Sequence, residues 1–300
     1  MTQNIDYHDD EIDLKDLLKV LWIQKKIIIF ISSLGALISV IVSLSLSNIY
    51  LSESTLLPTS QEDSLASKLG SLSSLSSIAG VALPKESVSK SDEAIERIKS
   101  FDFFSKNFLP NIKLENITAV KKWLPDTNSL VYDKKIYDSE KKKWIDGMPS
   151  QQQAYKNYQE ILGINAPLKT PFVRISIQHE SPVIAQRWVE IIIKQINETM
   201  RTNDADQAKK SILYLNKIAS STNVQSIKDA ISSLLESQMQ TLMLTSSNEM
   251  YVFKIIDAPI IPEKKFKPSR AIICILGTLI SVFIGLFIAF VQHYRTSTKS

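Results

Sequence analysis

Residues able to perform catalysis or to hold a metal are few in this chain and lie far apart. The three histidines, His8, His179 and His293, form no E-x-x-H motif or other paired spacing, so neither a metal site nor a histidine-based triad is predicted. The seven glycines form neither a GxxxxGK(S/T) nor a GxGxxG motif, which removes the usual signatures of nucleotide binding. We therefore expect no enzyme activity and no cofactor. His179 follows a predicted strand, and we interpret it as a structural residue.

The spacing that does recur is one of small residues within two apolar runs, at residues 27–47 and 271–291. Each run contains four small residues at four-residue intervals: Gly35, Ser39, Ser43 and Ser47 in the first, and Gly277, Ser281, Gly285 and Ala289 in the second. Small residues at this interval line one face of a helix and let two backbones approach closely. We hypothesise that the two stripes pack the runs together or join subunits. Chance spacing in runs rich in small residues is the alternative.

The elements that would carry these stripes are two transmembrane helices. Each run contains 21 residues without a charge, which as a helix spans roughly 30 Å, the thickness of a bilayer's hydrocarbon core. The first run has a 26-residue polar lead and no A-x-A cleavage pattern after it, so we interpret it as an anchor and not as a signal peptide. The absence of charges within the runs argues against a transporter. The chain then divides into a tail (1–26), a helix (27–47), a domain (48–270), a second helix (271–291) and a second tail (292–300).

Basic residues near the two runs give opposing signals about orientation. Four lysines precede the first run, and the next one after it is Lys68, which predicts a cytoplasmic N-terminus. The second run alone predicts the reverse, since four basic residues precede it: Lys264, Lys265, Lys267 and Arg270. The first helix usually dominates, and long loops translocate largely regardless of charge. We therefore expect both termini in the cytoplasm and the large domain outside the cytoplasmic membrane.

Composition excludes one class of partner and leaves two smaller patterns open. The net charge of +4 is spread among interspersed acids, so no nucleic-acid partner is predicted. In the N-terminal tail, Leu14, Leu17, Leu18, Leu21 and Trp22 recur at helical spacing, which predicts a short helix on the membrane lipid. It serves either as an anchor or as a contact for a partner. The run Lys141 to Lys143 is interpreted as a solvated face, with binding of an anionic polymer as the alternative.

Periodicity predicts an α+β domain. Strands are predicted at residues 50–57, 172–178 and 251–256, and helices at 65–78, 90–109, 151–163, 182–220 and 223–245. The helix at 182–220 has the strongest start in the chain, with Ser181 as N-cap and Pro182 at the first position. Its segment 201–210 is polar all round, so we expect it to stand away from the base or to be supported by neighbouring copies. Residues 111–148 give no clear pattern.

A stretch rich in proline connects the domain to the second membrane helix. Pro259, Pro262 and Pro268 lie within DAPIIPEKKFKP, and proline can neither donate a backbone hydrogen bond nor continue a helix. We therefore predict a stiff, non-helical joint at this point.

Three segments together resemble the Wzz-type polysaccharide co-polymerases, or chain-length determinant proteins, of Gram-negative inner membranes. They are IDLKDLLKVLWIQKK (12–26), VRISIQHESPVIAQRWV (173–189) and FKIIDAPIIPEKKFKPSRAIICILGTLISVFIG (253–285), and the Leu/Ser/Gly segment at 65–80 also looks like one found in some members. The proline-rich entry to the second helix is the most specific of these pieces. Ser281 departs from the family pattern, because glycine would be more usual there.

The resemblance implies a fold and a function. The fold would be an α+β membrane protein in which two transmembrane helices bracket a periplasmic α/β base with a long projecting helix, assembled as a homo-oligomer. The function would be to set the chain length of O-antigen or a related polysaccharide, made by a Wzy-type polymerase from undecaprenyl-linked repeats. Members of related classes carry a cytoplasmic tyrosine kinase. This chain ends nine residues after its second run and so looks like the kinase-free class.

The resemblance supplies no catalytic residue. The matching positions that we expect to serve structure or partner contact are Pro259, Pro262, Pro268, Gly277 and Gly285. A second hypothesis, from another class, is a two-helix sensor or adaptor whose periplasmic domain binds a ligand. Such a sensor needs an output, and the two short tails hold no signalling domain, although a partner could supply one.

Overall fold

The computed structural model describes residues 22–59 and 89–297, with side chains up to residue 292. The chain divides into two compact units, one made of residues 1–47 and 267–300 and the other of residues 48–266. The helix predicted in the N-terminal tail falls almost wholly outside the described residues, and the helix predicted at 65–78 lies entirely outside them.

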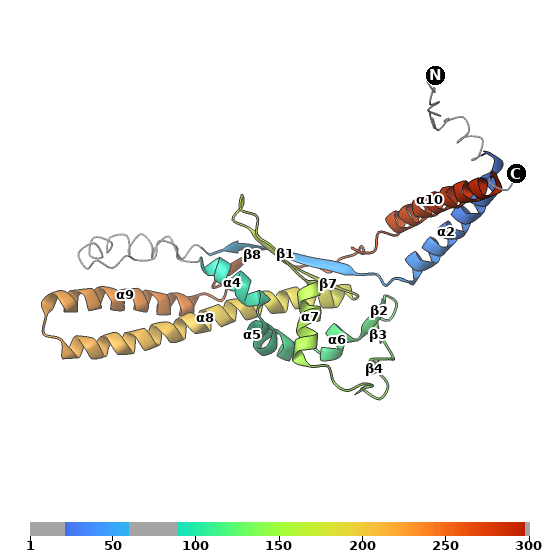
Figure 1. Ribbon diagram of the computed structural model, residues 1–300. Helices are drawn as coiled ribbons and strands as arrows, with labels where there is room; N and C mark the ends of the chain where they lie inside the picture. The colour runs from blue at the N-terminus through green and yellow to red at the C-terminus, as the bar shows by residue number, and fades with distance from the viewer. Residues whose placement is uncertain (1–21, 60–88, 298–300) are drawn as a thin grey trace, which may run out of the picture. The chain divides into compact units, whose positions relative to one another are not determined.

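The first unit is a pair of antiparallel helices, α2 (Lys25–Ser45) and α10 (Arg270–Ser297), which lie side by side in Figure 1. Both are long and apolar enough to cross a membrane, over Lys25–Ser45 and Arg270–Gln292. Helix α2 ends two residues before the predicted boundary at residue 47, and α10 continues six residues past residue 291. Their length and composition are those of a protein that crosses the membrane twice.

The second unit is built on a four-stranded antiparallel sheet with the order β6-β7-β1-β8. Its strands are β1 (Tyr50–Pro58), β6 (Leu162–Asn165), β7 (Val173–His179) and β8 (Phe253–Asp257). Tyr50 is paired with His179 across β1 and β7, and Pro58 lies opposite Phe253 on the other side of β1. The three predicted strands are confirmed. Strand β6 was missed because it begins directly where the preceding helix ends.

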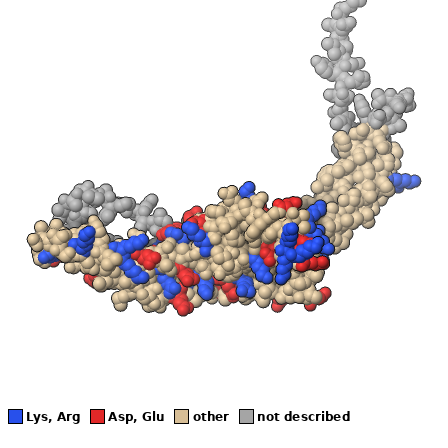
Figure 2. All heavy atoms as spheres, turned by 90° about the horizontal axis from the view of Figure 1, so that it is seen from below, with Lys and Arg blue, Asp and Glu red and all other residues tan. Residues whose placement is uncertain are grey.

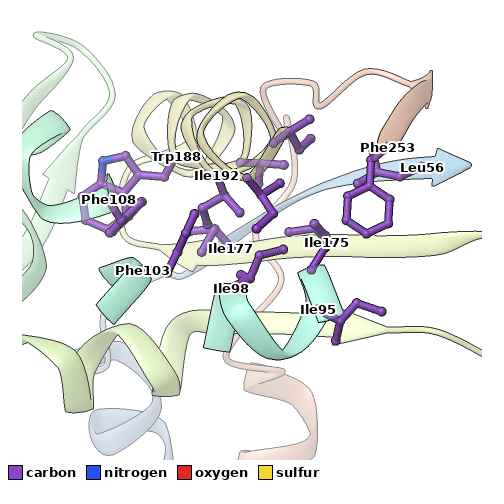
Figure 3. Close-up of a cluster of buried hydrophobic side chains, with 14 of the residues drawn as sticks. Leu56, Ile95, Ile98, Phe103, Phe108, Ile175, Ile177, Trp188, Ile192 and Phe253 are labelled. Carbon is purple, nitrogen blue, oxygen red and sulfur yellow. The ribbon is translucent and has the colours of Figure 1, made fainter. Parts of the chain in front are cut away.

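One face of this sheet is covered by helices and forms the core. Along β7 the side chains of Val173, Ile175 and Ile177 are buried while Arg174 is exposed, as expected for a strand with one buried face. Helix α8 (Pro182–Ser221) packs on β1 and β7. Figure 3 shows residues from three sources meeting in this core: Ile175 and Ile177 from the sheet, Trp188 and Ile192 from α8, and Ile98, Phe103 and Phe108 from the helical segments beneath.

The predicted continuous helix at 90–109 is wrong, because the chain breaks at Ser100. Helix α4 (Lys90–Lys99) is followed by α5 (Phe101–Phe103), a π-helical turn, η1 (Phe104–Phe108), and a 3₁₀ turn, η2 (Leu109–Asn111). Ser100 has an extended backbone, and its hydroxyl donates to the Arg97 carbonyl and accepts from the Phe103 amide. A serine that caps both helices in this way competes with continuous helix.

The predicted long helix is confirmed as α8, with the predicted Ser181 cap and Pro182 at its start. It is followed by α9 (Gln225–Ser247), and Figure 1 shows the two helices running side by side as a hairpin. The pattern of segment 201–210 predicted that it buries nothing, and this is wrong. Ala208 is buried, and the side chain of Asp204 is hydrogen-bonded to Lys90 of another helix. Support for this segment therefore comes from the same chain and does not require neighbouring copies.

Residues 111–148, which had no clear pattern, form a short helix and two small hairpins. Helix α6 (Leu114–Thr118) precedes the pair β2 (Val120–Leu124) and β3 (Ser129–Tyr132), and the pair β4 (Tyr137–Asp138) and β5 (Lys143–Trp144) follows. Helix α7 (Gln151–Ile161) then begins with a complete capping box between Ser150 and Gln153. It ends at Ile161, two residues before the predicted end at residue 163.

Candidate functional site

The small-residue stripes meet one another inside the helix pair. A Cβ atom added to Gly35 would overlap the side chain of Ser281, and one added to Gly277 would lie 2.5 Å from Cβ of Ser39. Real Cβ atoms do not come this close to other atoms at either position. The two helices therefore approach at these points only because a glycine faces a serine. Ser281, the departure from the family pattern, is accommodated because its neighbour across the contact is Gly35.

The remaining stripe positions differ in how closely they pack. Ser43 and Ala289 are buried, whereas a Cβ on Gly285 would meet the backbone of Ile28 at an ordinary 3.4 Å. Ser47 lies beyond the end of α2. Alongside the contact runs an apolar groove with a cavity volume of about 420 Å³, and its walls are the isoleucine and leucine side chains Ile31, Leu34, Ile38, Ile273 and Ile284.

Serine hydroxyls in the helix pair bond to their own helix. Ser39 Oγ donates to the Ala36 carbonyl at 2.8 Å, and Ser281 Oγ donates to the Gly277 carbonyl at 2.7 Å. Ser43 Oγ is buried and has no partner among the described residues. The contact between α2 and α10 therefore depends on close backbone approach, with no interhelical hydrogen bond shown for Ser39 or Ser281.

The proline-rich joint is attached along strand β1. Ser52 Oγ donates to the Ile260 carbonyl at 2.8 Å, and Ser54 Oγ donates to the Asp257 carbonyl at 2.6 Å. Both serines are buried, and so is Pro259. Pro262 and Pro268 are half-buried, and the segment from residue 258 to residue 269 contains no helix, as predicted. The role of β1 serines as anchors for this joint was not evident from the sequence, because a serine in a strand usually indicates only a polar face.

A buried asparagine connects α8 to β8. Asn197 Nδ2 donates to the carbonyls of Ile193 and Phe253, and its Oδ1 accepts from the amides of Val252 and Phe253 at 2.8 and 2.9 Å. Both N–H donors of the Asn197 amide and both lone pairs of its oxygen are therefore used in hydrogen bonds. The result is a fixed attachment between the long helix and the strand that leads to the proline joint.

A three-residue polar cluster lies where α8 leaves the core. Lys90 Nζ contacts Asp204 Oδ2 at 2.5 Å and Tyr251 OH at 3.0 Å, and Tyr251 OH donates to Asp204 Oδ2 at 2.6 Å. Burial opposes the charge of Lys90, but the bonds to Asp204 and Tyr251 outweigh it and raise the pKa of Lys90. Burial and the bond to Asp204 raise the pKa of Tyr251 to about 12. The cluster joins α4, α8 and the start of β8, and no sequence motif indicated it.

His179, the one histidine among the described side chains, is structural, as its position predicted. The Ser181 amide donates to Nδ1 at 2.9 Å, so Nδ1 is the acceptor and Nε2 donates to the Asn116 carbonyl at 2.9 Å. Burial lowers the pKa of His179. Its ring also makes an edge contact with Trp188, with centroids 4.8 Å apart. Among the described residues no group of His, Cys, Asp and Glu could hold a metal ion.

The fold defines a class: two helices long and apolar enough to span a membrane, packed through small residues, lie before and after an α/β unit in the sequence, and this unit carries a long helical hairpin. Residues 10–107 match the family model described as "Wzz: Chain length determinant protein". The resemblance to the Wzz family is therefore confirmed over residues 10–107, about a third of the chain.

Two solved structures are similar to the chain. One is a full-length bacterial polysaccharide co-polymerase, 15% identical, with a TM-score of 0.42, covering 95% of this chain and 99% of that one. The other is a fragment of WzzB, a polysaccharide co-polymerase from Salmonella Typhimurium, 14% identical, with a TM-score of 0.28, covering 73% of this chain and 100% of that one. No curated protein sequence matches the chain.

Proposed function

We propose that this protein regulates the chain length of O-antigen lipopolysaccharide or a related surface polysaccharide without catalysing a reaction itself. The observation that carries the proposal is the match of residues 10–107 to the chain length determinant family. The arrangement of two membrane helices around a single α/β unit supports it, because a regulator of this kind has to remain beside a membrane enzyme.

In this proposal the protein acts in the inner membrane beside a Wzy-type polymerase, on polysaccharide linked to undecaprenyl carrier. Lys25 and Lys26 at the start of α2 support a cytoplasmic N-terminus, which would place residues 48–266 in the periplasm and the C-terminus back in the cytoplasm. The small-residue positions Gly35, Ser39, Gly277 and Ser281 would hold the helix pair in a fixed shape for the polymerase to contact.

The test of function is deletion of the gene, followed by gel electrophoresis of the surface polysaccharide. We expect the preferred length to be lost and replaced by a distribution weighted towards short chains, with the original distribution restored by a wild-type copy. An unchanged length distribution in the deletion strain would overturn the proposal and favour a sensor or adaptor.

We also propose that the protein works as a homo-oligomer. The projecting hairpin exposes large apolar side chains on both helices, which a monomer would leave in water: Leu213, Tyr214, Ile227, Leu234, Met239 and Met243. A ring of copies would cover part of this surface. The contact surface offered by one copy to the next would then include the hairpin.

Light scattering of the full chain in detergent tests this assembly. We expect Leu213→Ser with Met243→Ser to reduce the oligomer size. Leu168→Ser is a matched control, because Leu168 is fully exposed on the loop between β6 and β7 and lies on neither hairpin helix. A wild-type chain that is monomeric at all concentrations would contradict the assembly and leave the length-regulator proposal to the gel.

A further inference from the structure

Two lysine-bearing segments that the proposed function leaves unused lie at the same end of the α/β unit. One is the proline joint, where Lys264 and Lys265 are exposed next to Phe266. The other is the β2/β3 hairpin, where Lys121 and Lys122 are exposed on β2. These segments are more than a hundred residues apart in the sequence, so their common location is a product of the fold.

The first residues of β1 hold both segments. The Phe266 amide donates to the Ile49 carbonyl at 2.8 Å, which fixes the joint beside the start of β1. The ring of Trp123 on β2 makes an edge contact with the ring of Tyr50, with centroids 5.5 Å apart. Because Ile49 and Tyr50 are adjacent, the lysines of the joint and of β2 are brought to one end of the sheet.

Two short chain connections join this end of the unit to the helices α2 and α10. Tyr50 is the fifth residue after the end of α2 at Ser45, which is at most ~17 Å of extended chain, and Arg270 at the start of α10 is the fourth residue after Phe266, at most ~14 Å. This bound follows from chain length alone. Lysines attached here are therefore within reach of lipid headgroups, whichever side of the membrane the unit occupies.

The charge pattern of the surface fits an anionic partner. Figure 2 shows Lys and Arg gathered, among some acids, at the end of the unit opposite the tip of the α8/α9 hairpin. The exposed pair Lys134 and Lys135 continues the surface beyond β3. Glu263 is the acidic neighbour of Lys264, and Asp138 lies 3.8 Å from Lys141, so Lys141 is left out of the surface.

The joint also exposes apolar side chains beside its lysines. Ile260, Ile261 and Phe266 are each about half exposed or more. Aromatic and aliphatic groups mixed with lysines are typical of segments that lie at the membrane–water interface. Basic residues next to membrane helices are usually enriched on the cytoplasmic side, whereas these lysines lie on the domain side of the second helix. Attraction to anionic lipid would account for their position.

We propose that Lys121, Lys122, Lys264 and Lys265, together with Lys134 and Lys135, form a surface that binds the phosphate headgroups of anionic phospholipids. The surface holds the sheet end of the unit against the bilayer and so limits how the unit can tilt on its two chain connections. This inference does not depend on the proposed role in polysaccharide synthesis.

Binding of short-chain phosphatidylglycerol to the full-length protein in neutral detergent, followed by native mass spectrometry, tests the surface. We expect phosphatidylglycerol to bind more tightly than phosphatidylcholine and to weaken as salt increases. Lys264→Gln with Lys265→Gln should weaken phosphatidylglycerol binding about fivefold for each lysine removed. Lys209→Gln with Lys210→Gln is the matched control, because these exposed lysines lie on the projecting hairpin, and we expect no change.

Three results would overturn the proposal. One is equal affinity for phosphatidylglycerol and phosphatidylcholine, and another is equal behaviour of the joint variant and the hairpin control. The third uses undecaprenyl phosphate as a competing probe. If it binds more tightly than phosphatidylglycerol and loses its affinity in the Lys264→Gln, Lys265→Gln variant, the surface recognises a carrier lipid and not bulk phospholipid. Lipid binding tests the lysine surface, and polysaccharide length on a gel tests the proposed function. The two measurements are independent, so either proposal can fail without the other.

Discussion

Polar groups are handled in opposite ways in the helix pair and in the α/β unit. Ser39 and Ser281 in the helix pair bond to carbonyls within their own helices, and the two helices meet where a glycine leaves room for a serine. In the α/β unit, Asn197 bonds to a strand more than fifty residues away in the sequence. The contact between α2 and α10 depends on the small size of the residues that face each other. The contact between α8 and β8 depends on directional hydrogen bonds between segments distant in the sequence. We expect the two regions to respond to different kinds of substitution.

The largest effect is expected at Asn197. Asn197→Ala would leave the amides of Val252 and Phe253 without an acceptor inside the core, and each such group costs ~1–3 kcal/mol. The free energy of unfolding should fall by about 4 kcal/mol. Thermal unfolding of the full chain in detergent, followed by circular dichroism, measures this change. Asn223→Ala, at an exposed position between α8 and α9, should have almost no effect, and equal losses in the two variants would contradict the assignment.

The next effect tests the helix pair by size alone. Gly35→Ala adds a methyl group that overlaps Ser281, which should cost about 1–3 kcal/mol of helix-pair stability. Ser281→Gly in the same chain should restore most of the loss, because it reopens the space. Gly285→Ala is the internal control, since its added atom meets only ordinary contacts. The readout is the fraction of protein that remains soluble after heating in detergent, and a double variant no better than Gly35→Ala would contradict this packing.

The pH dependence of the α/β unit should be governed in part by His179. Burial lowers the pKa of His179 in the folded protein, so the folded state keeps the ring neutral while the unfolded state binds a proton below about pH 6.5. This contribution to stability is complete above the unfolded pKa and is lost as pH falls below it, by at most ~1.4 kcal/mol per pH unit. Thermal melts between pH 7.5 and pH 5 measure the slope.

A variant separates His179 from other acid-sensitive groups. His179→Gln can still accept from the Ser181 amide and donate to the Asn116 carbonyl, but it cannot be protonated in this range. The slope should become shallower in this variant, while His8 and His293 remain in place as internal controls. An unchanged slope would assign the acid sensitivity to other residues.

The smallest expected effect lies in the cluster at the root of the hairpin. Tyr251→Phe removes the hydroxyl that donates to Asp204 and accepts from Lys90, but leaves the Lys90–Asp204 ion pair in place. The loss should be about 1 kcal/mol in the free energy of unfolding. Tyr214→Phe, on the exposed face of α8, is the matched control. A loss near zero would show that the ion pair alone holds the cluster together.

The sequence predicted those parts of the fold that depend on local signals. Ser181 and Pro182 defined the start of α8, and the alternation around Ile175 defined β7. The break at Ser100 was missed because the apolar stripe continues across it, and stripe periodicity reports burial without reporting continuity of the helix. Residues 111–148 could not be predicted because their strands are two to five residues long and depend on tertiary contacts such as Tyr50 with Trp123.

The spacing of small residues has a direct geometric meaning in the helix pair. The four-residue interval brought Gly35 to Ser281 and Ser39 to Gly277, a pairing that the stripes allowed but could not assign. The cluster of Lys90, Asp204 and Tyr251 could not be found, because its members are 114 and 47 residues apart and share no motif. The partners of His179 also come from the fold, since the Asn116 carbonyl lies 63 residues away.

The central position of strand β1 has a consequence for biosynthesis. It is the first strand of the unit to be made, yet its partners on either edge, β7 and β8, follow much later, and Ser54 finds its acceptor at Asp257 only 203 residues further on. A nascent chain therefore presents β1 with both edges open until β7 has been synthesised, and with the edge that pairs with β8 open until nearly the whole protein has been made. Such long-range pairing folds slowly and exposes strand edges to aggregation. A chain truncated before β8 should leave this strand as a point for chaperone binding or misassembly.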